Sequence, residues 1–269
     1  MQASLRTIDR ALADALTALV ARAADAILAI APTALHTRLK ADRSPVTAAD
    51  EAADAVIAEG LARLLPGLAV VSEESVARAG PLGASFALVD PLDGTKEFVA
   101  GRDEYTVNLA IIADGCPIAG FIAAPALGVM FRGIVGHGAE RLVRDAAAPV
   151  AIRCRQAPAG GLTATVSRSH LDAATSAFLD SLGVAARMTC GSALKFCRIA
   201  EGAADIYPRL SPTSEWDTAA GHAIVVAAGG AVTTPAGAPL RYGAWQQGFA
   251  VPGFIAWGDP TQQISARGD

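Results

Sequence analysis

Asp90-Pro91-Leu92-Asp93-Gly94-Thr95 is the stretch from which the architecture of this chain is best argued. It follows the strand-like segment Phe86–Val89 and places two carboxylates, a turn and a hydroxyl within six residues. Proline fixes its own φ and keeps the preceding residue extended. Asp90 is therefore expected to close the strand, and Leu92 and Asp93 to belong to the turn.

The atoms of this turn suit a metal ion. Asp90, Asp93 and the Leu92 carbonyl form the oxygen-only ligand set that Mg²⁺ prefers. Gly94 permits a backbone approach that a Cβ would block, and the Gly94 and Thr95 amides can face an anion. Taken alone, the hexapeptide is equally typical of an ordinary strand-to-loop turn, because Asp, Pro and Gly are common turn residues.

Composition narrows the class of protein. Of 269 residues, 52% are hydrophobic and 18% charged, which favours a compact enzyme-like fold over disorder. A net charge of −4 excludes a strong field for a nucleic-acid polymer or an anionic membrane. Charges interrupt the apolar runs near the N-terminus, so neither a signal peptide nor a transmembrane segment is expected. The four cysteines lack CxxC spacing and predict reduced thiols in a cytoplasmic protein.

The stretch Asp145–Gly161, rich in Ala, Pro and Gly, is the candidate boundary between two halves. The first, residues 1–148, is expected to be an α+β domain that carries most of the metal ligands, with helices at 4–30 and from Thr47 to about 65 and strands at 70–71, 105–112, 117–123, 129–135 and 139–143. The second, residues 149–269, alternates strands at 163–166, 185–189, 205–207 and 231–233 with helices at 171–182, 192–201 and 217–228. This alternation is typical of an α/β layer and predicts the fold class α/β.

Further acids stand where strands end or helices begin. Glu73 follows the strand at 70–71, Asp217 opens a helix with Ser214 as its N-cap, and Asp50 follows the N-cap Thr47. Each one alone is adequately explained by capping or by a solvated loop. Together they favour a two-metal site, whose ions sit about 3.5–4 Å apart and need a bridging carboxylate, for which Asp90 is suited. Zinc is disfavoured, because no His or Cys accompanies the acids.

Several segments in register resemble a known family. Asp90–Phe98, Ser72–Glu74, Ser44–Asp50 and Trp216–His222 together look like the inositol monophosphatase superfamily of Mg²⁺-dependent, lithium-sensitive phosphatases. Within it, Ser167–His170, Gly191–Cys197 and Tyr207–Arg209 most resemble the bacterial CysQ-type 3′(2′),5′-bisphosphate nucleotidases, enzymes of sulfur metabolism. The resemblance covers residues 36–230. It implies a layered αβαβα sandwich, two or three Mg²⁺ per site, and a monomer or homodimer in the cytoplasm, with peripheral inner-membrane association as an alternative.

The resemblance also implies residue roles. Glu73, Asp90, the Leu92 carbonyl, Asp93 and Asp217 would hold the metals. Asp50, Thr95 and Glu73 would take part in catalysis, with Thr95, oriented by Asp50, helping to activate the attacking water. The amides of Gly94 and Thr95 would contact the scissile phosphate.

The expected substrate is a small phosphorylated nucleotide. The hypothesis is removal of the 3′-phosphate of adenosine 3′,5′-bisphosphate to give AMP, with 3′-phosphoadenylyl sulfate as a further substrate. Lys195 and Arg209 are candidates for the second phosphate, although both would serve equally well as surface residues. Lys96, His170 and Ser192 complete the expected contacts, with helix-start capping as an equal alternative for His170. His222 is expected to be structural. An inositol or sugar monophosphatase, or a metal-responsive protein without catalysis, stays open as an alternative.

Overall fold

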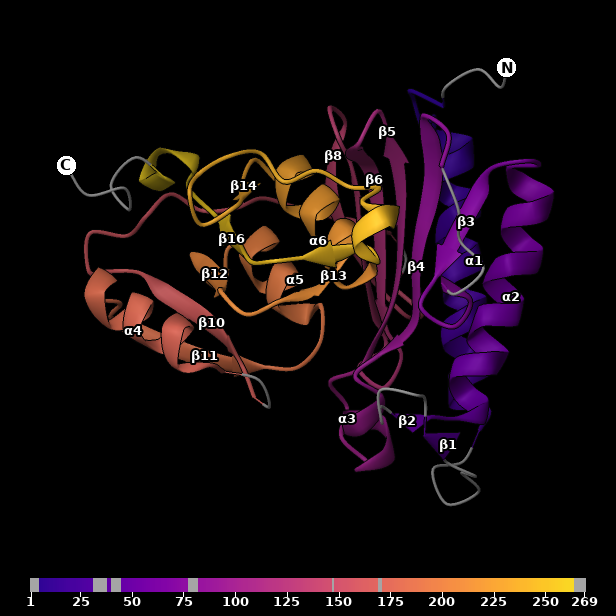
Figure 1. Ribbon diagram of the computed structural model, residues 1–269, viewed down its shortest axis with the longest axis horizontal. Helices are drawn as coiled ribbons and strands as arrows, with labels where there is room; N and C mark the ends of the chain where they lie inside the picture. The colour runs from indigo at the N-terminus through magenta and orange to yellow at the C-terminus, as the bar shows by residue number, and fades with distance from the viewer. Residues whose placement is uncertain are drawn as a thin grey trace.

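The computed structural model describes residues 5–30, 38–39, 45–76, 82–146, 148–168 and 171–263. Figure 1 shows five layers across the molecule: a helix pair, a large sheet, a central helix pair, a second sheet and an outer helix. This arrangement confirms the expected αβαβα sandwich. No helix in the described ranges is long and apolar enough to cross a membrane.

The first layer is formed by α1 (Arg10–Leu28) and α2 (Ala48–Leu64). α1 is shorter than the expected helix at 4–30, because Asp9 caps it by accepting a hydrogen bond from the Leu12 amide at 2.8 Å. α2 begins at the predicted capping box of Thr47 and Asp50. That cap fixes Asp50 at the start of the helix. Before α2, β1 (Arg38–Leu39) pairs antiparallel with β2 (Pro45–Val46).

The large sheet has the order β3-β4-β5-β6-β7-β8-β9, and every pairing in it is antiparallel except that of β3 with β4. Its strands are β3 (Ala69–Ser72), β4 (Ser85–Asp93), β5 (Thr106–Ala113), β6 (Cys116–Ala124), β7 (Val129–Ile134), β8 (Gly138–Val143) and β9 (Val150–Ile152). The division at residues 148 and 149 stays a prediction; β9 extends this sheet to Ile152.

β4 does not end at Asp90 as expected. It runs on to Asp93, which pairs with Thr106 after a register shift between Asp90 and Asp93. Pro91 lies within that shift, where the regular hydrogen-bond ladder is interrupted. A backbone N–H is not needed there, so the N–H that proline lacks costs no strand hydrogen bond. The C-terminal end of β4 therefore carries both carboxylates. The short helix α3 (Thr95–Val99) begins directly after Gly94.

The second sheet has the order β11-β10-β12-β16-β14. Its strands are β10 (Thr163–Ser167), β11 (Ala186–Cys190), β12 (Ile206–Arg209), β14 (Ala231–Thr233) and β16 (Phe254–Trp257). β10 is parallel to β11 and β12, as an α/β layer predicts. β16, which the sequence analysis did not predict, lies antiparallel between β12 and β14. The strand pair β13 (Thr213–Ser214) and β15 (Ala250–Val251) lies outside both sheets.

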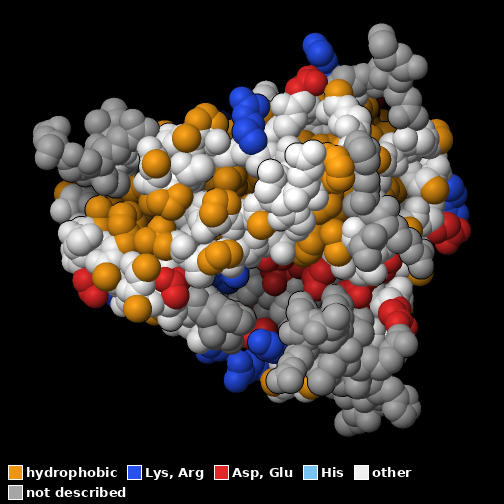
Figure 2. All heavy atoms as spheres, viewed as in Figure 1, with side chains coloured by type: hydrophobic (Ala, Val, Ile, Leu, Met, Phe, Trp, Pro, Cys, Tyr) orange, Lys and Arg blue, Asp and Glu red, His pale blue; other side chains and the backbone are white. Residues whose placement is uncertain are grey.

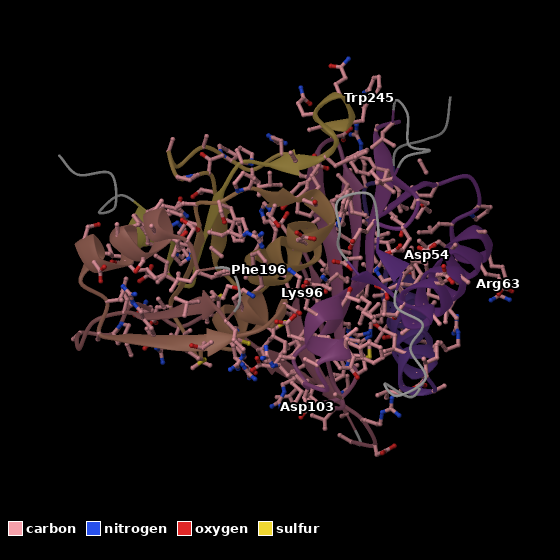
Figure 3. The ribbon with its side chains drawn as sticks, turned by 60° about the horizontal axis from the view of Figure 1, so that its bottom comes forward. Asp54, Arg63, Lys96, Asp103, Phe196 and Trp245 are labelled. Carbon is pink, nitrogen blue, oxygen red and sulfur yellow. The ribbon has the colours of Figure 1, made fainter. Side chains whose placement is uncertain are left out.

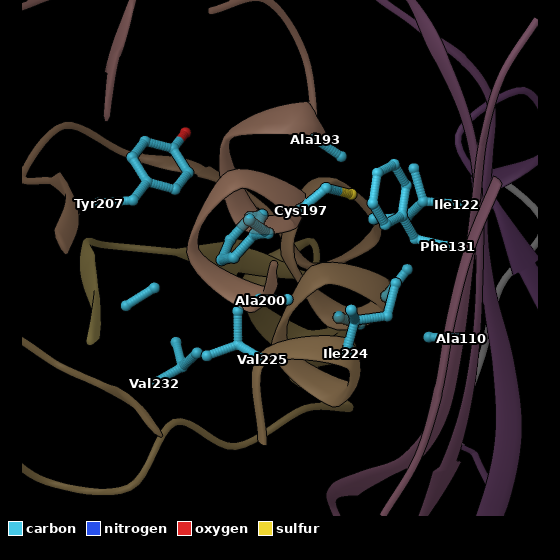
Figure 4. Packing of buried hydrophobic residues seen from close by; sticks show 14 of the residues in the cluster. Ala110, Ile122, Phe131, Ala193, Cys197, Ala200, Tyr207, Ile224, Val225 and Val232 are labelled. Atoms are coloured by element: carbon cyan, nitrogen blue, oxygen red, sulfur yellow. The ribbon is translucent and has the colours of Figure 1, made fainter. Parts of the chain in front are cut away.

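Helices cover both faces of the second sheet. α4 (Ala173–Leu182) packs on its outer face, and α5 (Leu194–Ala200) and α6 (Glu215–Ala227) lie between the two sheets (Figure 1). Figure 4 shows Ala193, Cys197 and Ile224 of this central layer beside Ile122 and Phe131 of the large sheet. Short 3₁₀ turns follow at Trp245–Gln247 and Pro260–Gln263.

The four cysteines are free thiols, with Cys190 and Cys197 buried and Cys116 and Cys154 half-buried. The expectation that the cysteines are unpaired agrees with this; their reduced state stays a prediction.

Close contact between α6 and the large sheet depends on glycine. A Cβ at Gly120 of β6 would lie 2.2 Å from the Ala220 carbonyl oxygen of α6. We expect Gly120→Ala to destabilise the fold by about 2–3 kcal/mol, because backbone atoms cannot yield as a flexible side chain would. In thermal unfolding the melting temperature should fall by roughly 5–10 °C.

Gly160→Ala is the matched control, because nothing lies within 4 Å of a Cβ there. Equal melting temperatures for the two variants would refute this account of the α6 packing.

Candidate active site

A cleft of about 280 Å³ opens where the two halves meet. Figure 2 shows acidic side chains along one wall of this hollow, with Lys and Arg side chains on its other sides. The predicted residues that line it are Glu73, Asp90, Leu92, Asp93, Gly94, Thr95, Lys96, Ser192, Lys195, Arg209 and Asp217. Two larger cavities, of about 520 and 700 Å³, border α1 and β7 and contain none of the predicted site residues. His170 lies outside the described residues.

The carboxylates repel one another inside the cleft. Asp90 is only 2% exposed. Its pKa is raised well above the ordinary value, first by burial and then by Glu73, Asp93 and Asp217. Burial and Asp217 raise the pKa of Asp93 to about 6, against the opposing charge of Lys195. The four acids therefore form one electrostatically coupled group.

Two polar residues of β5 orient Asp93. The Thr106 hydroxyl and the Asn108 side-chain amide each donate to Asp93 Oδ2 at 3.4 Å. Asn108 Oδ1 is buried and has no hydrogen-bond partner among the described residues. Sequence reasoning missed both residues. The available signal was two polar side chains in alternate positions of the otherwise apolar strand Thr106–Ala113.

The first turn of α6 delivers two acids in different directions. Asp217 closes a capping box with Ser214 and accepts from the Ser214 amide at 3.2 Å and from the Thr213 hydroxyl. It lines the cleft. Glu215 is fully buried and accepts from the amides of Gly243 and Ala244 at 2.7 and 2.8 Å. One helix start therefore holds a cleft carboxylate and anchors the segment that leads to β15.

Thr95 and Asp50 form the expected pair. The Thr95 hydroxyl lies 3.2 Å from Asp50 Oδ1 and 3.1 Å from the Leu92 carbonyl oxygen. Asp50 Oδ2 accepts from the Thr47 amide and hydroxyl at 2.8 and 2.7 Å. Burial raises the pKa of Asp50 despite these bonds. Asp50 thus stands behind Thr95, outside the lining of the cleft, with its carboxylate held from two sides.

Gly94 and Ser192 join the two halves at the cleft. Gly94 has φ 92°, and a Cβ there would lie 2.3 Å from Ser192 Oγ. Ser192, itself at φ 48°, donates its hydroxyl to the carbonyl oxygens of Asp93 at 2.9 Å and Glu104 at 3.0 Å. Its hydroxyl is therefore engaged with backbone, and its predicted contact with substrate stays a prediction.

The three basic residues predicted to bind phosphate, Lys195, Arg209 and Lys96, differ in burial and in the hydrogen bonds that hold them. Lys195 is 4% exposed, and its ammonium donates to the Ser192 carbonyl at 2.6 Å and lies over the Tyr207 ring. Arg209 is half-buried and donates to the Pro212 carbonyl at 3.1 Å, while its Nε is buried without a partner in the described ranges. Lys96 of α3 is exposed, and Figure 3 places it near Phe196 of α5, where the halves meet.

The donor atoms of the cleft fit a hard divalent cation. Carboxylates of four acids and the Leu92 carbonyl offer only oxygen, the preference of Mg²⁺. No three His, Cys, Asp or Glu side chains in the described part of the chain form a ready-made metal cluster. The carboxylates thus share one cleft without closing on one point, and the raised pKa of Asp90 reflects burial and then repulsion, both of which a divalent cation would offset.

Known proteins match this chain along most of its length. The sequence pattern of the inositol monophosphatase family matches residues 6–257. The 3′(2′),5′-bisphosphate nucleotidase CysQ of Shigella flexneri is 44% identical over 230 residues, covering 80% of this chain and 86% of that protein. The protein of the same name from Escherichia coli O157:H7 is 41% identical over 258 residues, covering 90% and 97%. The crystal structure of CysQ from Bacteroides thetaiotaomicron superposes with a TM-score of 0.76 at 34% identity, covering 91% and 97%.

His222 of α6 lies outside the cleft lining and has a packing role, as expected. It is 8% exposed, its Nδ1 lies 2.9 Å from the Tyr242 hydroxyl, and burial lowers its pKa to about 4. As the pH falls, His222 therefore binds a proton near pH 6.5 in the unfolded chain but only near pH 4 in the folded chain. This residue stabilises the fold most above pH 6.5.

We expect the free energy of unfolding of the wild type to fall by about 2–3 kcal/mol relative to His222→Asn between pH 7 and pH 4.5. Urea unfolding at several pH values measures the difference. Parallel pH curves for the two proteins would show that His222 is not held neutral by the fold.

Proposed function

The chain belongs to the inositol monophosphatase family, and on that ground we propose that it is a Mg²⁺-dependent phosphatase acting on adenosine 3′,5′-bisphosphate. Water adds to phosphorus, the bond between phosphorus and the 3′-oxygen breaks, and AMP and inorganic phosphate are released. The convergence of Glu73, Asp90, Asp93 and Asp217 in one cleft carries the proposal. The 41–44% identity to proteins named for this activity supports the substrate. A cytoplasmic location and a monomeric or dimeric state stay predictions.

Metal binding would fall to the acids of the cleft. Glu73, Asp90, Asp93 and Asp217 with the Leu92 carbonyl would hold two or three Mg²⁺, Asp90 in the bridging position. When bound, the ions lower the pKa of water and neutralise charge on phosphate and the leaving oxygen. Asp90 suits the bridging role because it is buried in the cleft and Glu73, Asp93 and Asp217 all act on its pKa.

Thr95 and Asp50 would move the first proton. Thr95 would pass its hydroxyl proton to Asp50 Oδ1 as a lone pair of Thr95 Oγ1 accepts a proton from the attacking water, so that Asp50 ends with the proton and Thr95 stays neutral. The Thr47 cap keeps Asp50 in place, so the carboxylate cannot turn away from Thr95. The amides of Gly94 and Thr95 are proposed to face the scissile phosphate.

A substrate panel tests the proposed activity. Phosphate release in Mg²⁺ should be fastest with adenosine 3′,5′-bisphosphate, followed by 3′-phosphoadenylyl sulfate, and added Li⁺ should inhibit it. Faster turnover of inositol 1-phosphate or fructose 1,6-bisphosphate would replace the nucleotidase with an inositol or sugar phosphatase. Absence of turnover across the panel would favour a binding protein.

The metal ligands are tested by removing one charge. Asp93→Asn or Asp217→Asn should lower kcat by about a thousandfold or more, because several kcal/mol of transition-state stabilisation depend on the ions. The melting temperature of the metal-free protein should hold or rise, since each variant removes a charge from a repelling group. Asp180→Asn, on the exposed face of α4, is the control. Retention of most activity by either cleft variant would exclude its role as a ligand.

A further inference from the structure

Arg168 is a cation of the cleft that the sequence analysis did not single out. It follows β10, lines the cleft, and its side chain is 43% exposed. Of the other basic residues in the lining, Lys195 is buried and donates to the Ser192 carbonyl, Arg209 donates to the Pro212 carbonyl, and Lys96 lies on α3, next to the turn that carries Asp93. Arg168 is therefore a guanidinium with room to move toward a ligand.

Glu104 holds Arg168 from the opposite half of the molecule. Its Oε2 lies 2.8 Å from Arg168 Nη2 and 3.3 Å from Nε, and it also accepts from the Gly191 amide at 3.0 Å. Three donors thus share one oxygen. If the Arg168 guanidinium moves away, Glu104 still accepts the hydrogen bond from the Gly191 amide. The movement therefore leaves no buried polar group without a hydrogen bond.

We infer that Arg168 determines substrate specificity: it exchanges Glu104 for the second, non-scissile phosphate of the substrate. This inference rests on the proposed function and names the residue that would separate a bisphosphate from a monophosphate. An exposed ion pair is weak, whereas a guanidinium binds phosphate through two parallel hydrogen bonds. The exchange therefore favours the phosphate.

The position of Arg168 suits the second phosphate better than the scissile one. Glu73, Asp90, Asp93 and Asp217 gather on one side of the cleft, where the reacting phosphate must meet the metals. Among the described residues, Arg168 forms an ion pair with none of these acids and instead donates to Glu104 Oε2, the oxygen that also accepts from the Gly191 amide. Arg168 thus belongs to the rim near Gly191.

The experiment compares two substrates that share the scissile bond. We expect Arg168→Gln to raise KM for adenosine 3′,5′-bisphosphate about tenfold or more with kcat within about twofold, and to leave hydrolysis of adenosine 3′-monophosphate unchanged. Arg168→Lys, which keeps the charge without the paired geometry, should recover part of the loss. Arg187→Gln is the control, because Arg187 is a partly exposed arginine that pairs with Asp180 of α4.

Two results would overturn the inference. An equal loss with both substrates would mean that Arg168 only supports the Gly191 turn, and a loss no larger than that of Arg187→Gln would mean that it binds nothing. Failure of the proposed function appears separately, as a wild type that prefers inositol 1-phosphate. In that event the inhibition constant of adenosine 3′,5′-bisphosphate replaces KM. If the wild type is not inhibited, or the constant is unchanged in Arg168→Gln, the inference fails.

Discussion

The close approach of Gly94 to Ser192 is the constraint on which the cleft depends. Two turns, one from each half, meet there so closely that a Cβ on Gly94 would overlap the Ser192 side chain. Gly94 and Ser192 both adopt positive φ. Such conformations are held only when the surroundings determine them. Here the Ser192 hydroxyl supplies that constraint, because the backbone carbonyl oxygens of Asp93 and Glu104 both lie within hydrogen-bond distance of it. The wall that carries the acids and the wall that carries the cations are thereby placed relative to each other.

The acids of the cleft lie in a place that is unfavourable for carboxylates when no cation is bound. β4 runs through the apolar interior, and its last residues hold Asp90 and Asp93 within reach of Glu73 and Asp217. Burial and like charge both disfavour the ionised forms, so the group is a source of instability until a cation enters. Because the surrounding layers are extensively packed, the fold can tolerate this local strain in exchange for a preformed site.

Local patterns in the sequence predicted the parts of the site that form locally. Each helix start is fixed by two residues within one turn: Thr47 and Asp50 for α2, and Ser214 and Asp217 for α6. The sequence therefore predicted both helix starts. Three features escaped, because each arises from pairing between distant segments. β4 continues past Pro91 because Thr106 pairs with Asp93, Asn108 reaches Asp93 across a strand, and Glu104 meets Gly191 across the cleft. The alternate polar positions of β5 are the one local signal, and they indicate an inward-facing pair without naming Asp93 as its partner.

The place of β16 in the second sheet has a consequence for biosynthesis. Within the described residues, β14 pairs along its length with β16 alone, and β16 also completes the hydrogen bonding of β12. A ribosome must therefore release residues 254–257 before this layer can close, although every predicted cleft residue has been made by residue 217. Long-range pairing of this kind is slow to form. The half that is synthesised first, which carries most acids of the cleft, therefore waits for β16 before its opposite wall is secured.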